Sequence, residues 1–250
     1  MRKEDVWDMK AAVPLRTSHS KVVEQLGLAI VAGQFDVGET LPGDMDLEQQ
    51  FKVSRSVLRE AMKTLSAKGL VVAKSRVGTR VTEKCHWNLL DECVLRWHFR
   101  AGVTKEFLNH LYDFRLVLEP AAAAFAAERA SPDECAELRR YALALGAPDL
   151  SFREQVEADL RFHVLLLLVA ANPFMESMAG FIKTSLDGAF MLAYRQHFRP
   201  AGEGIIQSHL AMVEAIERKD ANAARDAAQR VIELGRKSAV AALDTPHPEA

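Results

Sequence analysis

The sequence has few cysteines, no long apolar run and little net charge. The chain has three cysteines, Cys85, Cys93 and Cys135, which is an odd number, and their spacings match no zinc-binding pattern. We therefore expect free thiols in a reducing compartment. The longest apolar run, Val164–Ala171, is too short to span a bilayer, and Met1–Lys10 lacks the apolar core of a signal peptide. These absences predict a cytoplasmic protein with no membrane partner and no disulfide framework.

A net charge of −2 over 250 residues conceals a local excess of basic side chains. Residues 51–84 contain nine lysines and arginines but only two acidic residues, Glu60 and Glu83. A basic patch on a nearly neutral chain is the electrostatic pattern typical of a nucleic-acid-binding surface.

The periodicity of residues 18–82 predicts a winged helix-turn-helix domain that follows a flexible arm at 1–17. Helices are expected at 21–32, at 44–51 and from the capping residue Ser54 to about Lys68. Strand-like residues at 70–73 and 79–82 then flank a turn at 75–78. Three helices followed by a hairpin are the order of elements in a winged helix.

The third predicted helix has one apolar face and one face that carries Arg55, Ser56, Arg59 and Lys63. Its three basic residues are four positions apart, and such like-charge pairs mildly destabilise a helix. We therefore expect Arg55, Ser56 and Arg59 to contact base edges in the major groove, and Lys63 to contact the DNA backbone. The alternative is an ordinary solvated face.

The predicted hairpin is also basic, with Lys74, Arg76 and Arg80 around Gly78. Gly78 permits a tight turn and a close backbone approach, and the three cations can reach phosphates or the minor groove. Taken alone, the same residues would also suit a charged surface hairpin.

The first domain resembles the GntR superfamily of bacterial regulators. The residues that carry this resemblance are the runs Leu41–Leu47, Val53–Ala61, Leu65–Leu70 and Gly78–Thr79. Many members of the family have an arginine that contacts DNA where this chain has Met45, which carries no charge. The resemblance implies a homodimer on a double-stranded operator whose half-sites lie about one helical turn apart.

After a predicted linker at 83–90, residues 91–244 are expected to form an antiparallel all-helical bundle, and 245–250 a polar tail. The breaks between helices are expected at 102–104, 131–132, 146–148, 172–173, 199–202 and 219–222. The segments Phe114–Pro120 and Asp159–His163, together with His209, resemble the FCD domain of FadR-type regulators. The resemblance implies a domain that binds an effector and forms the dimer.

Asp159 and His163 are four residues apart, so both side chains leave one face of a helix and could chelate one metal ion. A hydrogen-bonded pair on the helix surface is the alternative. The family resemblance adds His209 and a further histidine as metal ligands, but this chain has Val231 at the last position. The hypothesis is an incomplete Asp/His/His site for Zn, Ni or Mn, or no metal at all.

Arg115 is the main candidate to bind the carboxylate of an effector, because it lies next to the apolar stripe of its helix. A salt bridge to Glu119, four residues on, is equally consistent with the spacing. Asn172, Arg195 and Gln207 are weaker candidates. The segment Trp87–Trp97 could simply dock the linker on the bundle. It also resembles the interdomain segment of FCD regulators of sugar-acid catabolism, including galactonate-type repressors. This resemblance implies a small hydroxy acid as effector.

The leading hypothesis is a dimeric repressor controlled by a small carboxylic or sugar acid, and not an enzyme. Two histidines and one carboxylate also match the facial triad of non-haem iron oxygenases, which leaves a metal-dependent enzyme as an alternative. A constitutive architectural DNA-binding protein is the third class, and it predicts a fully apolar bundle interior.

Overall fold

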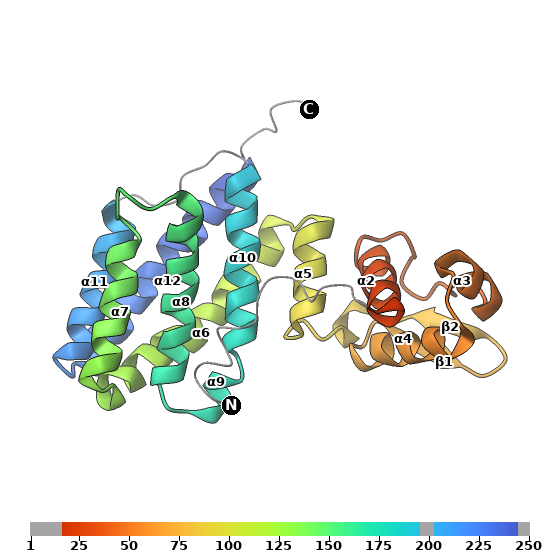
Figure 1. The fold of residues 1–250 in the computed structure, drawn as a ribbon, viewed down its shortest axis with the longest axis horizontal. Helices are drawn as coiled ribbons and strands as arrows, with labels where there is room; N and C mark the ends of the chain where they lie inside the picture. The colour runs from red at the N-terminus through yellow and green to blue at the C-terminus, as the bar shows by residue number, and fades with distance from the viewer. Residues whose placement is uncertain (1–16, 196–202, 245–250) are drawn as a thin grey trace. The chain divides into compact units, whose positions relative to one another are not determined.

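Two separate units make up the chain in its computed structural model, which describes residues 17–195 and 203–244 (Figure 1). The first unit is residues 1–102 and the second is residues 103–250. Within the described ranges, no helix is long and apolar enough to cross a membrane.

The first unit begins with three helices, α2 Ser18–Val31, α3 Asp44–Phe51 and α4 Arg55–Ala67. Thr17 and Ser54 cap α2 and α4 by accepting hydrogen bonds from backbone N–H groups of the first turns. Lys52 adopts a left-handed φ of 53° between α3 and α4, which makes the tight turn of the helix-turn-helix. The predicted order of elements is confirmed.

The wing is a two-stranded antiparallel hairpin of β1 Val71–Lys74 and β2 Gly78–Val81. Val71 pairs with Val81, and both side chains are buried in the core of the first unit. Thr40 forms an isolated bridge with Arg80, so the segment before α3 pairs with the outer edge of β2. The hairpin is thereby held on the helices at its base while its turn stays exposed.

The last helix of the first unit corrects the predicted domain boundary. The predicted linker at 83–90 contains a short 3-10 helix, η1 Lys84–His86. The predicted start of the bundle is helix α5 Glu92–Ala101, which belongs to the first unit. Trp87 and Trp97 lie in the core of the first unit, and an added Cβ on Gly27 of α2 would come within 2.4 Å of the Trp97 ring. These aromatic rings therefore belong to the core of the winged-helix unit.

The second unit is a bundle of helices, among which α9 is a single turn. Their bounds are α6 Lys105–Arg129, α7 Pro132–Ala144, α8 Phe152–Val169, α9 Pro173–Glu176, α10 Ala179–Arg195, α11 Glu203–Glu217 and α12 Ala221–Asp244. Helix α8 packs against α6, α7 and α10 (Figure 1), and its residues from Val164 to Val169 are all buried. The predicted helix breaks are confirmed, except that residues 199–202 lie outside the described ranges.

Candidate functional site

The exposed face of α4 carries the four residues of this helix that the sequence predicts to contact DNA. Arg55, Ser56, Arg59 and Lys63 are exposed, while Leu58, Ala61 and Leu65 on the opposite face are buried. Lys63 forms an ion pair with Glu60 at 2.8 Å. Arg55 and Arg59 are exposed, and no ion pair of either occurs among the residues described.

The cations of the wing differ in their surroundings. Lys74 and Arg76 are exposed at the turn, where Arg76 adopts a left-handed φ of 62°. Arg80 is half-buried, and its Nε donates a hydrogen bond to the Gly38 carbonyl oxygen at 2.6 Å. Gly78 has a φ of 108°, and an added Cβ would lie 3.1 Å from the Thr40 side chain. Gly78 therefore permits the close packing of the wing against Thr40. Arg80 likewise holds the loop before α3, which the sequence alone does not indicate.

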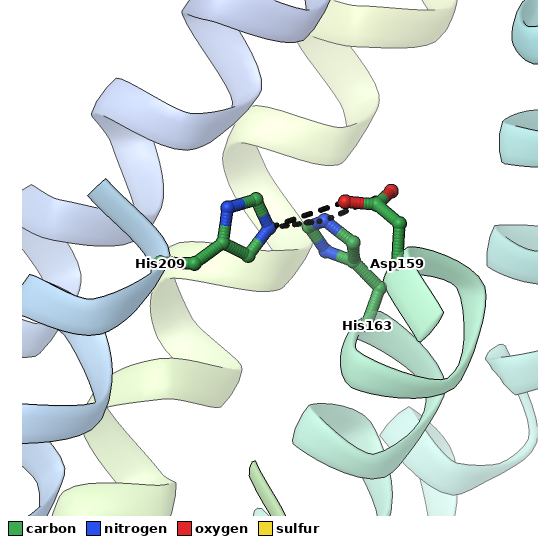
Figure 2. Close-up of side chains that lie close together, drawn as sticks. All are labelled: Asp159, His163 and His209. Carbon is green, nitrogen blue, oxygen red and sulfur yellow. Dashed lines mark hydrogen bonds and ion pairs between the residues drawn. The ribbon is translucent and has the colours of Figure 1, made fainter. Parts of the chain in front are cut away.

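The second unit brings Asp159, His163 and His209 together inside the bundle (Figure 2). Asp159 and His163 come from α8, and His209 comes from α11. His209 Nε2 lies 3.3 Å from Asp159 Oδ1 and 3.4 Å from His163 Nε2, and His163 Nε2 lies 3.8 Å from Asp159 Oδ2. All three side chains are buried. The helix spacing alone predicts only the pair on α8.

The second ring nitrogens of the two histidines determine what this group can bind. His209 Nδ1 lies 2.8 Å from the Ile205 carbonyl oxygen, and His163 Nδ1 lies 2.5 Å from Glu119 Oε2. Burial alone would raise the pKa of Glu119, but Arg115 and His163 together lower it to about 2, so Glu119 is an ionised acceptor. Both imidazoles therefore donate from Nδ1, so both Nε2 atoms face each other and Asp159, where a cation or a proton can lie between them.

This donor set fits a divalent metal ion. Two imidazole lone pairs and a carboxylate repel one another unless a cation or a proton lies between them. Zinc ligands about 2.1 Å from a tetrahedral centre are about 3.4 Å apart, close to the separations between these atoms. Burial favours the neutral acid, yet His163 and His209 hold the pKa of Asp159 below its ordinary value, so this ligand is ionised.

Arg115 and Glu119 form the salt bridge that their spacing allows, and Arg115 also lines the cavity beside the Asp/His/His group. Arg115 Nε donates to Glu119 Oε1 at 2.6 Å, and both side chains are almost completely buried. The Arg115 guanidinium lies over the Tyr112 ring, 5.0 Å from its centroid. The two interpretations of Arg115, as a salt-bridge partner and as an effector contact, are therefore compatible.

The cavity has a volume of about 80 Å³ and mostly apolar walls. Its polar lining consists of Tyr112, Arg115, Gln155, Asp159, His163, His209 and Ser238. Sequence reasoning missed Tyr112, Gln155 and Ser238. Helical spacing could have found the first two, because Tyr112 is three residues from Arg115 and Gln155 is four residues from Asp159.

The weaker effector candidates do not gather at this cavity. Asn172 caps α9 by accepting a hydrogen bond from the Phe174 N–H, and Gln207 is exposed; neither lines the cavity. Arg195 ends α10, but its side chain lies outside the described residues. Val231 is buried in the cavity wall, so an apolar side chain occupies the position where the family resemblance implies a fourth metal ligand.

Comparisons with known families and proteins agree with both units. The family of bacterial regulatory proteins called gntR matches residues 19–81, and the FCD domain matches residues 110–234. The HTH-type transcriptional regulator YieP of Escherichia coli K12 is 32% identical over 216 residues, which are 84% of this chain and 90% of YieP. The chain belongs to the GntR family of transcription regulators.

This GntR regulator is also similar to the galactonate operon transcriptional repressor of Escherichia coli K12. The two are 29% identical over 212 residues, which cover 85% of this chain and 92% of the repressor. Among solved structures, Lar, which controls expression of the agr system of Listeria monocytogenes, matches 90% of this chain and 97% of its own at a TM-score of 0.57 and 19% identity. At that identity the likeness concerns the fold alone. The protein is a DNA-binding regulator with an FCD effector-binding domain.

Proposed function

We propose that this GntR regulator acts in the cytoplasm as a repressor that a small carboxylic or sugar acid releases from its operator. One observation carries the proposal: a single cavity in the FCD domain joins Arg115 to the Asp159, His163 and His209 group within apolar walls. A cavity with apolar walls and a few convergent polar groups is typical of a site for a small polar ligand.

Arg115 supplies the contact for the carboxylate of the effector. Its Nε is bound to Glu119, so the two terminal nitrogens of the guanidinium are not needed for that ion pair. They can donate in parallel to the two oxygens of a carboxylate. The Tyr112 ring supports the plane of the guanidinium and fixes its direction.

Asp159, His163 and His209 are the residues that would hold a divalent metal, with Zn, Ni or Mn as candidates. Such an ion would supply a Lewis-acid contact for the carboxylate or hydroxyl oxygens of the acid. Because Val231 contributes no ligand atom, the coordination positions beyond these three side chains are available to effector or water.

A homodimer would present two copies of α4 to successive major grooves. Helix α6 exposes Phe114 and Val117, three residues apart, with 38% and 75% of their surfaces accessible. Exposed apolar side chains on one helix face support an interface with a second copy of the chain.

The buried polar groups argue against an inert architectural bundle. Such a protein would have an apolar interior, whereas Arg115, Glu119, Asp159, His163 and His209 are all buried here. Burial of these charges and imidazoles is costly, and a ligand site gives a reason to retain them.

Binding to DNA from the region upstream of its own gene tests the proposal. The apparent Kd for fluorescently labelled DNA is measured by anisotropy with and without galactonate and other aldonates. The effective acid should weaken binding by roughly 5- to 150-fold. Arg115→Met should lose this response, whereas Arg161→Met, which removes a half-buried arginine that pairs with Glu157 and does not line the cavity, should keep it. If no small acid changes the Kd, the mechanism is wrong.

A further inference from the structure

We propose that Glu119 is a positioning residue. It holds the His163 proton on Nδ1, so that the Nε2 lone pair faces Asp159 and His209. Arg115 occupies the other oxygen of Glu119 and thereby fixes which group Glu119 presents to His163. The inference rests on the proposed metal site. Glu119 bridges two donors, with Oε1 2.6 Å from Arg115 Nε and Oε2 2.5 Å from His163 Nδ1. It belongs to α6, whereas His163 belongs to α8, so one carboxylate joins two helices behind the site.

The chemistry of a carboxylate explains why this bridge sets the tautomer. An ionised carboxylate only accepts hydrogen bonds, and a guanidinium only donates them. Arg115 uses one oxygen of Glu119, and the other oxygen requires the His163 proton to be on Nδ1. The lone pair of His163 is then on Nε2, 3.4 Å from His209 Nε2 and on the side where a metal would bind.

Burial makes the arrangement obligatory. The side chains of Arg115, Glu119 and His163 are at most 3% exposed, so bulk water cannot replace a missing partner. A glutamine at position 119 has nearly the same size, but it offers one acceptor and one donor. Because Arg115 accepts nothing, the amide oxygen must face Arg115 and the amide NH2 must face His163.

That orientation reverses the tautomer of His163. The NH2 of a glutamine would donate to Nδ1 and move the imidazole proton to Nε2, where it blocks metal ligation. Removal of the donor at position 115 would free the amide to rotate and return its oxygen to His163. A second substitution at Arg115, which is not a metal ligand, should therefore restore the metal binding that Glu119→Gln removes.

Calorimetric titration with Zn²⁺ alone into the chelator-treated full chain tests this prediction. Glu119→Gln should weaken Zn²⁺ binding by about 10- to 100-fold, and the double variant Glu119→Gln, Arg115→Met should recover most of the loss. Glu157→Gln is the matched control, because Glu157 pairs with Arg161 four residues away on the exposed side of α8. Unchanged binding by Glu119→Gln, or no recovery in the double variant, would contradict the proposal.

The tautomer itself gives a readout that does not depend on metal binding. Nitrogen NMR of the metal-free, histidine-labelled wild type should show His163 protonated on Nδ1, with the signal assigned by its loss in His163→Gln. A His163 that carries its proton on Nε2 alone in the wild type would overturn the inference. If the tautomer is as expected but wild type binds no Zn²⁺, the metal part of the proposed function fails while the role of Glu119 stands.

Discussion

At the scale of single residues, Arg59 and Lys74 represent two kinds of cation on the DNA-binding unit. Arg59 lies on the exposed face of α4, whose backbone is fixed by packing of the opposite face. Lys74 ends β1 beside the exposed turn of the wing. An arginine on a rigid helix can hold a bidentate geometry on a base, whereas a flexible lysine acts as a point charge for phosphates.

This difference predicts different effects of Arg59→Ala and Lys74→Ala. Arg59→Ala should reduce the preference for operator over scrambled DNA by about 1–3 kcal/mol. Lys74→Ala should weaken binding to both DNAs alike and reduce the slope of log K against log salt by about 1. Anisotropy titrations at several salt concentrations measure both quantities, and identical behaviour of the two variants would refute this division of roles.

At the scale of elements, the sequence pattern predicted where helices begin and end better than it predicted which helices pack against one another. Ser54 caps α4 as predicted, because a cap depends on atoms within one turn of the chain. Likewise, the spacing of Asp159 and His163 places them on one face. By contrast, Trp97 docks on Gly27, and Glu119 bonds to His163 across 44 positions. An amphipathic pattern shows that a face is buried but not what covers it, so both contacts escaped prediction.

The contact between α2 and α5 is open to a direct test. Gly27→Ala would place a Cβ within 2.4 Å of the buried Trp97 ring. Overpacking costs about 1–3 kcal/mol, which exceeds the gain of up to about 1 kcal/mol from replacing glycine within a helix. We expect a lower free energy of unfolding of the first unit, measured by tryptophan fluorescence in urea. Gly204→Ala, with open space at its Cβ, should not alter that transition.

At the scale of the whole molecule, the two units carry different chromophores. The three tryptophans, Trp7, Trp87 and Trp97, all precede residue 103, and the three tyrosines, Tyr112, Tyr141 and Tyr194, all follow it. In a Trp7→Phe background, tryptophan fluorescence therefore follows the DNA-binding unit through Trp87 and Trp97. Far-ultraviolet circular dichroism is dominated by the second unit, which contains the long helices α6, α8 and α12.

This separation makes the effect of a metal on each unit measurable in one protein. A ligand at 100 times its Kd stabilises the folded state by about 2.7 kcal/mol, and Asp159, His163 and His209 all lie in the second unit. Zn²⁺ added to the chelator-treated Trp7→Phe protein should therefore raise the Tm measured by circular dichroism and leave the Tm measured by tryptophan fluorescence unchanged. Asp159→Asn should abolish the shift. If both Tm values rose equally, the two units would unfold as one cooperative unit. Stabilisation of the bundle by the metal would then also stabilise the winged helix, and the prediction of separate transitions would be wrong.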